Sequence, residues 1–423
     1  MVTKVEEIRS YLIASIQNGK LAPGDRLPSI RQLANQFSCN KDTVQRVLME
    51  LRFDNYIYAK PRSGYYVFDS HQEEVEEGVS LPNSEIANIA YDDFRLCLNE
   101  TLIGREDYLF NYYYRQEGLL DLSKAVAKLM EETGVYVPLD DIVITAGTQQ
   151  ALFILTQVTF PNRKSRVLIE EPTYPRMIEL IKTQKLPYET ISRGTHGIDF
   201  QRLEEIFQTQ SIKFFYVIPR MHNPLGTSYN PVEMKRLIEM AEKYDVYIVE
   251  DDYMSDFASQ SPLHYYDTHG RVIYLKSFSK AIFPALRLAA ICLPQALKST
   301  FMAYKKLMDY DTNLILQKAL ALYIENGLYA KNSQYLKYRY QKDLANSKSI
   351  LADQPNLPPY SLHHDSVLFD CSKLDNFKTL RQYGDTLENY FCQKSHQSLL
   401  QVKNDSYLKQ FLGSLQYNCR GTV

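Results

Sequence analysis

Residues 271–287 read RVIYLKSFSKAIFPALR. The apolar run VIYL is typical of a buried strand. Ser277, Ser279 and Lys280 follow it directly, and Arg287 lies seven residues after the lysine. Polar groups just beyond the end of a buried strand are where open α/β sheets bind ligands. This stretch therefore predicts a strand followed by a ligand-binding loop.

Four other apolar runs also have polar residues at or just after their ends. They are DDIVITAG (140–147), SRVLIEEP (165–172), KFFYVIP (213–219) and YDVYIVEDD (244–252), with helical patterns between them. Strands that alternate with helices predict an α/β domain with a mainly parallel central sheet. The loops after these strands are therefore the place to look for a ligand site.

The first of these loops suits a phosphate. Thr148 and Gln149 open an apolar helical run after IVIT, and the free amides and positive dipole end of a helix N-terminus favour an anion. An ordinary strand-to-helix turn has the same pattern. Tyr174, after the second run, could stack on a flat ring or simply pack in the core.

The remaining strand ends supply an amine, a carboxylate and hydrogen-bonding groups. Lys280 can form a Schiff base with an aldehyde, and Asp251 can keep a pyridine nitrogen protonated. Asn223 and Tyr253 can hydrogen-bond a phenolic oxygen beside the aldehyde. A ligand with an aldehyde, a basic ring nitrogen, a ring hydroxyl and a phosphate is pyridoxal 5′-phosphate (PLP). The side chains expected near its phosphate are Thr148, Gln149, Ser277, Ser279 and Arg287.

The N-terminal segment differs in charge from the rest of the chain. Residues 1–67 hold ten Lys or Arg and six Asp or Glu, so they carry +4, whereas the whole chain of 423 residues carries −2. This excess alone would fit a solvated surface. No Lys or Arg occurs from Ser63 to Phe94, an acidic stretch typical of a linker. The expected domains are a DNA-binding domain at 1–68, an acidic flexible linker at 69–90, and a large domain at 91–423 with a small subdomain from about residue 310.

The basic segment has the pattern of a helix-turn-helix unit. Apolar residues recur at helical spacing from Ile30 to Phe37, after Ser29 as a candidate N-cap, and again from Val44 to Leu51. A short break at residues 38–39 separates the two helices. The run YIYAKPRSGYYVF (56–68) then predicts a β-hairpin whose basic tip suits a DNA backbone.

This segment closely resembles a known DNA-binding domain. NGKLAPGDRLPSIRQLANQFSCNKDTVQRVL, followed by NYIYAKPRSGYYV, is similar over residues 4–68 to the winged helix-turn-helix of the GntR family of bacterial repressors. The resemblance implies binding to double-stranded operator DNA. It places at the DNA the residues Arg31, Asn40, Lys41, Thr43 and Gln45, with Arg62, Ser63 and Gly64 in the wing.

The large domain resembles fold-type I aminotransferases of class I. The matching pieces are TAGTQQAL, EEPTYP, HNPLG, VEDDY and SFSKAIFPALR. The resemblance implies a smaller C-terminal α+β domain and a homodimer with cofactor sites near the subunit interface. It implies that Lys280 holds PLP, that Asp251 partners the pyridine nitrogen and that Tyr174 stacks on the ring. It also implies a tyrosine that reaches the neighbouring subunit's phosphate, for which Tyr114 is the candidate and the two tyrosines before it are alternatives.

The combination of the two domains resembles the MocR/GabR family of bacterial transcriptional regulators. The resemblance implies a PLP-dependent regulator that binds promoter DNA and senses a small amine, an amino acid or PLP through Lys280. An effector must bind two conformers with different affinity to act on DNA. A change in how a dimer holds its two DNA-binding domains would then alter affinity for a pair of half-sites.

The C-terminal region departs from the aminotransferase pattern. The resemblance implies an Arg for the substrate carboxylate in a motif like LRLGF, whereas the comparable stretch KQFLGSLQ (409–416) has Phe411 at that place. Arg176 is a candidate for an effector carboxylate and equally for a surface ion pair. This departure argues against efficient transamination and against a standard α-amino acid as effector.

Two other functions fit the same motifs. A PLP-dependent aminotransferase with an accessory DNA-binding domain would turn over an amino donor with a keto acid. A DNA-binding protein whose cofactor site is reduced to a dimerisation scaffold would show no visible absorption from a cofactor at Lys280.

Composition argues against several classes of protein. The apolar runs are short, whereas a membrane span needs about 20 apolar residues, and the N-terminus lacks the pattern of a secretory signal. The six cysteines include no CxxC pair, which favours reduced thiols over disulfides or a zinc site. We therefore expect a cytoplasmic protein without a metal site.

Overall fold

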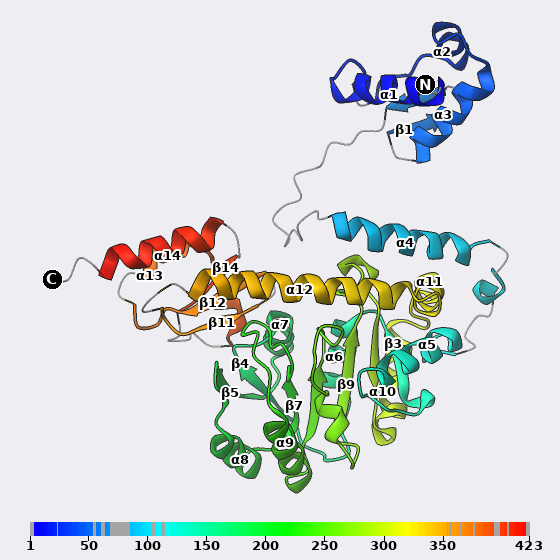
Figure 1. The fold of residues 1–423 in the computed structure, drawn as a ribbon. Helices are drawn as coiled ribbons and strands as arrows, with labels where there is room; N and C mark the ends of the chain where they lie inside the picture. Colours follow the sequence, from blue (N-terminus) through cyan, green and yellow to red (C-terminus); the bar gives the residue numbers. More distant parts are fainter. Residues whose placement is uncertain are drawn as a thin grey trace. The chain divides into compact units, whose positions relative to one another are not determined.

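The computed structural model divides the chain into two compact units, Met1–Pro82 and Asn83–Val423, here called the N-terminal and C-terminal units (Figure 1). Three predicted site residues, Arg62, Ser63 and Tyr114, lie outside the described residues. The structure describes residues 4–22, 24–53, 56–60, 64–67, 85–103, 106–110, 115–352, 354, 357–363, 365–374, 377–392, 398–403 and 406–419.

The N-terminal unit is a winged helix-turn-helix, as predicted. Helices α1 (Lys4–Gln17), α2 (Ile30–Gln36) and α3 (Lys41–Phe53) precede an antiparallel hairpin of β1 (Ile57–Lys60) and β2 (Gly64–Val67). Their apolar faces form one core that includes Ile8, Leu33 and Leu48. Ser29 caps α2 as expected: its hydroxyl accepts from the Gln32 amide, and the Gln32 side chain accepts from the Ser29 amide.

The C-terminal unit is built on an eight-stranded sheet with the order β3-β10-β9-β8-β7-β4-β5-β6. Only β10, against both neighbours, and β6, against β5, run antiparallel within this sheet, so the predicted mainly parallel α/β architecture is confirmed. The strands are β3 (Ile142–Thr145), β4 (Arg166–Glu171), β5 (Tyr188–Gly194), β6 (Gly197–Ile198), β7 (Ile212–Val217), β8 (Tyr247–Asp251), β9 (Val272–Ser277) and β10 (Ala289–Cys292).

Helices cover both faces of this sheet because successive strand residues point to opposite sides. Val143 packs into one core with α6 (Thr148–Gln157), α7 (Pro175–Gln184) and α10 (Gln295–Met308). Ile144 packs into another core on the opposite face. The helices on that face are α4 (Glu85–Thr101), α5 (Leu120–Glu131) and α11 (Leu314–Glu325), with α8 (Phe200–Thr209) and α9 (Pro231–Lys243) over the other half of the sheet.

Strand register brings the predicted site residues to one edge of the sheet. Asp251, the last residue of β8, pairs with Leu275 of β9. Ser277, the last residue of β9, pairs with Ala289 of β10, which in turn pairs with Thr145 at the end of β3. The carboxyl ends of the parallel strands therefore meet here, where such sheets bind ligands.

A small subdomain follows the 25-residue helix α12 (Leu328–Ala352), which begins next to the end of α11 and extends toward the small sheet (Figure 1). Its antiparallel sheet has the order β11-β12-β14-β13 and packs against α14 (Ser406–Cys419). Its other elements are β11 (Tyr360–Leu362), β12 (Ser366–Asp370), α13 (Phe377–Leu380), β13 (Asp385–Thr386) and β14 (Leu399–Lys403). In the described parts of the chain, every helix is too short or too polar to cross a membrane.

Two predicted domain limits differ from the structure. Helix α4 begins at Glu85, inside the linker expected at 69–90, because it packs Phe94 and Cys97 into the core of the large sheet. The small subdomain begins later than residue 310, because α11 buries Leu320 and Tyr323 in that same core.

The position predicted for a carboxylate ligand near the C-terminus is a core position. Phe411 lies on α14, is fully buried, and packs its ring 4.6 Å from the ring of Phe369. Leu351 and Leu400 belong to the same cluster. The alignment of KQFLGSLQ with an Arg motif was therefore wrong in placing residue 411 at a ligand site, because the apolar pattern of α14 fixes this side chain inside the small subdomain.

Candidate functional site

Asp251 is a buried carboxylate at the end of β8. It is 4% exposed, and Tyr216 Oη donates to its Oδ2 at 2.7 Å. The other oxygen, Oδ1, is buried and accepts no hydrogen bond from the described residues. Burial raises the pKa of Asp251 to about 6 in spite of the bond from Tyr216. A buried carboxylate with one open oxygen favours a ligand that brings a positively charged N–H donor.

Tyr216 was missed by the sequence analysis. It lies on β7, next to β8, and is fully buried. The only signal for its role was a hydroxyl within the apolar run KFFYVIP. A buried tyrosine needs a hydrogen-bond partner, and neighbouring strands bring it to Asp251.

Two of the predicted tyrosines lie close to this carboxylate. Tyr174 precedes α7 and packs partly against the core, and burial together with the Asp251 charge raises its pKa to about 12. Burial and Asp251 likewise raise the pKa of Tyr253 well above its ordinary value. Tyr253 Oη donates to the Met221 carbonyl at 3.0 Å and lies 3.4 Å from Nε2 of His363.

Asn223 lies on a loop held by a buried charged network. The side chain of Asn223 is half-buried and has no hydrogen bond to the described residues. Its neighbour His222 lies with Nε2 3.3 Å from Glu170 Oε2. Burial and the nearby Arg193 guanidinium lower the pKa of His222 to about 4, so the imidazole is neutral at neutral pH.

Glu170 is the centre of that network. Arg193 Nη1 donates to Glu170 Oε1 at 2.7 Å, Tyr229 Oη donates to the same oxygen, and the Ile218 amide donates to Oε2 at 3.2 Å. Burial alone would raise the pKa of Glu170, but Arg193 and His222 outweigh it and hold the pKa at about 2. An ionised carboxylate thus ties the strand ends to the loop that carries Asn223.

Gly147 and Arg287 form a cradle at the start of α6. A Cβ at position 147 would lie 2.8 Å from Nη2 of Arg287, and Gly147 has φ 83°, so only glycine fits here. Arg287 Nη2 donates to Gln149 Oε1 at 3.1 Å. Thr148 is the first residue of α6. The guanidinium and the helix N-terminus together favour an anion.

The two serines of SFSK bond to each other. The Ser279 amide donates to Ser277 Oγ at 3.3 Å, and Ser277 is largely buried at the end of β9. Both belong to the turn that leads from β9 to Arg287.

The two lysines of residues 271–280 differ sharply. Lys276 is fully buried, and its Nζ donates to Ser255 Oγ at 2.6 Å and to Asp256 Oδ1 at 3.0 Å. Lys280 is exposed and forms no hydrogen bond or ion pair with the described part of the chain. Lys280 is therefore the amine that is available to react.

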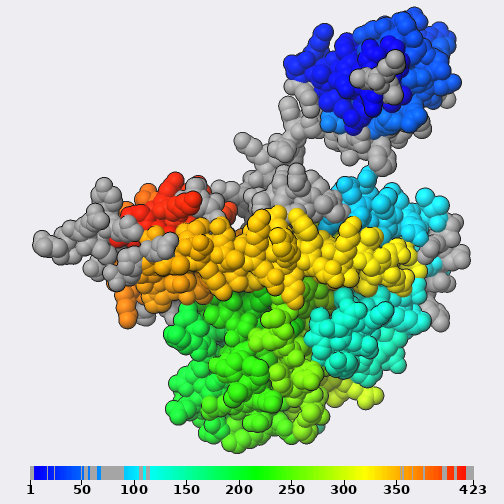
Figure 2. All heavy atoms as spheres, in the orientation of Figure 1, coloured from blue at the N-terminus to red at the C-terminus, as the bar shows by residue number. Residues whose placement is uncertain are grey.

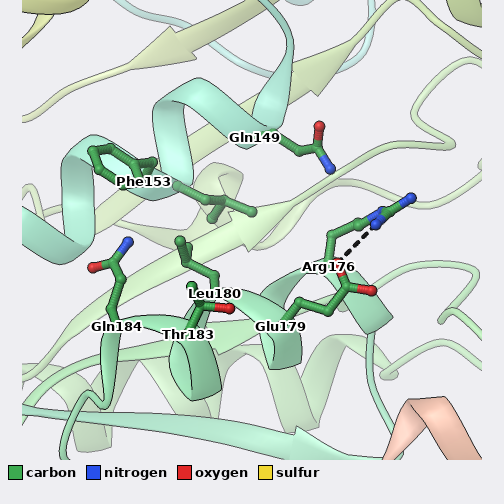
Figure 3. A pocket seen from close by; sticks show the side chains of 8 residues that line it. Gln149, Phe153, Arg176, Glu179, Leu180, Thr183 and Gln184 are labelled. Carbon is green, nitrogen blue, oxygen red and sulfur yellow. Dashed lines mark hydrogen bonds and ion pairs between the residues drawn. The ribbon is translucent and has the colours of Figure 1, made fainter.

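Arg176 forms the surface ion pair that was one of its two predicted roles. Its Nη1 donates to Glu179 Oε2 at 2.7 Å, and both side chains are more than half exposed. The pair closes one end of a hollow of about 330 Å³ between α6 and α7, with Gln149 beside it and Phe153 and Gln184 at the other end (Figure 3).

The small subdomain contacts the three loops that carry Tyr174, Asn223 and Tyr253. Besides the contact of His363 with Tyr253, the Thr173 amide donates to the Tyr390 carbonyl at 3.0 Å, and the Cys392 amide donates to Glu171 Oε1 at 2.6 Å. A Cβ at Gly226, three residues after Asn223, would collide with the Leu362 carbonyl. These long-range contacts had no signal in the sequence.

In the N-terminal unit, the predicted DNA-binding residues divide into two groups. Asn40 caps α3: its Oδ1 accepts from the Thr43 amide at 2.8 Å and from the Thr43 hydroxyl at 2.6 Å. Arg31, Lys41 and Gln45 are exposed and form no hydrogen bond or ion pair with described residues. The wing residue Gly64 pairs with Lys60 at the end of the hairpin.

In protein freed of bound small molecules, we expect the free energy of unfolding to depend on pH because Asp251 is buried. Its pKa of about 6 in the folded protein is above the ordinary 3.8, so the folded form gains the proton first as pH falls. Ionised Asp251 then destabilises the fold at pH 7 by roughly 2–3 kcal/mol, and most of this is recovered by pH 4.

Urea unfolding of wild type and Asp251→Asn at both pH values measures this contribution. Asp251→Asn should be more stable than wild type at pH 7, and the difference between their free energies of unfolding should shrink toward pH 4. The other carboxylates are present in both proteins, so their titration does not contribute to this difference. Equal stabilities at both pH values would contradict the buried, unpaired carboxylate.

Each of the two units matches a known protein family. Residues 4–67 match the family of bacterial regulatory proteins, gntR family, and residues 103–352 match aminotransferase class I and II. YcxD of Bacillus subtilis (strain 168), described as an uncharacterized HTH-type transcriptional regulator, is 39% identical over 352 residues, 81% of this chain and 77% of that protein. The HTH-type transcriptional regulator NorG of Staphylococcus aureus (strain NCTC 8325 / PS 47) is 24% identical over 74% of this chain and 78% of its own.

Solved structures with the same fold include aminotransferases. Pyrococcus horikoshii kynurenine aminotransferase, in complex with PMP, covers 77% of this chain and 87% of its own with a TM-score of 0.67 at 21% identity. The match to LysN, the α-aminoadipate aminotransferase of Thermus thermophilus, covers 77% of this chain and 89% of LysN, with a TM-score of 0.66 at 23% identity. The chain therefore belongs to the HTH-type transcriptional regulators that join a GntR-family winged helix to a fold-type I, class I and II aminotransferase domain, the architecture of the MocR/GabR family.

Proposed function

We propose that the C-terminal unit binds PLP and that the protein regulates transcription in response to a small amine or to PLP itself. The observation that carries this proposal is the open Oδ1 of Asp251, buried beside a satisfied Oδ2. A protonated pyridine nitrogen is a cationic N–H donor and would complete this carboxylate. Solved relatives of the fold with bound PMP and phosphopyridoxyl-leucine support the same ligand class.

The other site residues fit the remaining parts of PLP. Tyr174 would lie against the ring, Asn223 and Tyr253 would hydrogen-bond its phenolic oxygen, and Arg287 at the Gly147 cradle would bind the phosphate. Thr148, Gln149, Ser277 and Ser279 would contribute further phosphate contacts, with Tyr114 of a second subunit. When bound, PLP supplies an aldehyde that condenses with amines and a ring that withdraws electrons.

Lys280 is the group through which the effector would act. Its exposed amine has no competing partner in the described chain, unlike Lys276. An effector amine that competes with Lys280 for the aldehyde leaves this side chain free to move. An effector carboxylate would draw Arg176 away from Glu179, because the exposed pair between them is weak.

The small subdomain is suited to pass this change on. It contacts the loops of Tyr174, Asn223 and Tyr253 through Tyr390, Leu362 and His363. An effector that prefers one arrangement of these contacts shifts the population of the whole unit toward it.

We further propose that two copies associate and act on DNA in the cytoplasm. The C-terminal unit exposes Ile103, Phe110 and Leu307 by 75–86%. Tyr108 beside Phe110 and Asp311 beyond Leu307 line one hollow, so these segments lie side by side. A surface with several exposed apolar side chains indicates a protein interface. A dimer would present two winged helices to two half-sites of operator DNA.

Lys280→Ala should abolish the covalent attachment of PLP. Wild-type protein treated with PLP and then borohydride should carry a stable mass increment, which peptide mass spectrometry should place on Lys280 and not on Lys276. The variant should show neither this increment nor the visible absorption of bound cofactor. An unchanged spectrum in Lys280→Ala would refute the assignment of this lysine. Turnover of an amino donor by wild type would favour the aminotransferase alternative.

Arg31→Ala should weaken binding to a DNA duplex selected by the protein from a random library. Loss of one base or phosphate contact should lower affinity roughly 10- to 100-fold. Fluorescence anisotropy at fixed salt measures this, with Lys20→Ala, an exposed lysine after α1, as the matched control. If both variants lose affinity equally, the effect is general charge and Arg31 has no specific contact.

Phe110→Asp combined with Leu307→Asp should convert the dimer into monomers, because each change buries a carboxylate in the proposed interface. Sedimentation equilibrium gives the oligomeric state, and Val232→Asp, which alters a residue equally exposed on α9, is the control. A wild-type monomer, or a dimer that survives the double change, would contradict this interface.

A further inference from the structure

Helix α12 carries a concentration of positive charge on an otherwise acidic unit. Its 25 residues include five basic residues and one acidic residue, Asp343, whereas the chain beyond residue 67 has a net charge of −6. The basic residues are Lys331, Lys337, Arg339, Lys342 and Lys348.

Four of these cations have no ion-pair partner among the described residues. Lys331 Nζ lies 3.9 Å from Asp93 Oδ2, but Lys337, Arg339, Lys342 and Lys348 form no salt bridge or side-chain hydrogen bond there. In contrast, Arg193 and Lys276 of the same unit are buried in ion pairs.

The remaining face of α12 holds the helix in place. Tyr329, Asn332, Ser347 and Leu351 are buried, and Tyr329 Oη donates to Asp256 Oδ2 at 2.8 Å. Two exposed tyrosines, Tyr335 at 40% and Tyr338 at 62%, lie on the solvent side with the exposed Lys342 and Lys348, whereas Lys337 and Arg339 are half-buried. In Figure 2 the helix, in yellow and orange, is open to solvent along the length seen in that view.

We propose that this face binds the phosphate backbone of DNA as a second contact, beside the winged helix. The residues of this solvent-facing half, called the α12 basic face, are Tyr335, Tyr338 and Lys342 along its centre, Lys337 and Lys348 on one flank, and Arg339 on the other flank. The inference rests on the proposed DNA binding of the N-terminal unit.

Charge and spacing favour duplex DNA as the occupant. The span from Lys337 to Lys348 covers about 16 Å of helix axis, along which a duplex presents roughly ten phosphate charges. Unpaired lysines release counterions on binding phosphates, and tyrosine hydroxyls also donate to them. The face has no Leu, Ile or Phe that would insert into a lipid surface.

Tethering strengthens such a contact. A surface on the same chain as a DNA-binding unit meets DNA at a high effective concentration, so individually weak phosphate contacts add to affinity. They add nothing to sequence preference, because phosphates are the same at every base pair.

The test uses the full chain with Lys337→Gln, Lys342→Gln and Lys348→Gln combined. The control has the same loss of charge elsewhere on the unit: Lys124→Gln, Lys128→Gln and Lys185→Gln, which alter exposed residues. Binding is measured by anisotropy as a function of salt, on the selected duplex and on the same duplex extended by about one helical turn, 10 base pairs, at each end.

The α12 variant should lose roughly 10-fold in affinity for the extended duplex at low salt. Its slope of log affinity against log salt should become shallower by about 2–3, near 0.9 for each phosphate contact removed. The control should match wild type, and wild type should prefer the extended duplex where the variant does not.

Equal slopes and affinities for the two triple variants would overturn the proposal. So would α12-dependent binding to anionic vesicles with DNA binding unchanged, which would assign the face to a membrane surface. If wild type itself binds neither duplex, the proposed DNA binding of the N-terminal unit fails, and that result is distinct from a failure of the α12 basic face.

Discussion

A carboxylate buried at the end of a central strand is the constraint on which the proposed cofactor site depends. Asp251 has one oxygen satisfied by Tyr216 and the other open, and burial raises its pKa to about 6. Leaving a charged acceptor unpaired in a buried site is destabilising. Buried groups with shifted pKa values are enriched at functional sites, and a ligand with a cationic N–H would supply the hydrogen bond that Oδ1 lacks among the described residues.

The loops around Asp251 are held by two sets of contacts, one within the large sheet and one from the small subdomain. Glu170, ionised and bonded by Arg193 and Tyr229, ties the Asn223 loop to the sheet. The small subdomain meets the site loops through polar contacts, such as that of His363 with Tyr253, and through a buried apolar cluster in which Leu225 packs with Leu368 and Phe391.

Local patterns in the sequence predicted much of this molecule, and long-range packing explains what they missed. Ser29 and its capping box, the strand runs and the SFSK loop are encoded within a few residues, so they were predictable. The contacts that were missed join residues far apart in the chain: Tyr216 and Asp251 are 35 residues apart, Glu170 and Arg193 are 23 apart, and His363 and Tyr253 are 110 apart. Nothing in the sequence next to these residues indicates their partners.

The incorrect predictions have the same origin. Phe411 was aligned by a short motif, but its place is set by an aromatic contact with Phe369 in a sheet formed by distant strands. The limit at residue 310 failed because α11 is as apolar as a small-subdomain helix would be, yet its partners are α4 and α5. Sequence periodicity shows which face of a helix is buried, but it does not show which other element that face packs against.

Nitrogen NMR of the full chain with ¹⁵N-labelled PLP tests the role of Asp251 most directly. The account predicts a protonated ring nitrogen at neutral pH in wild-type protein and an unprotonated one in Asp251→Asn. An unprotonated nitrogen in wild type, or a protonated one in both proteins, would contradict it.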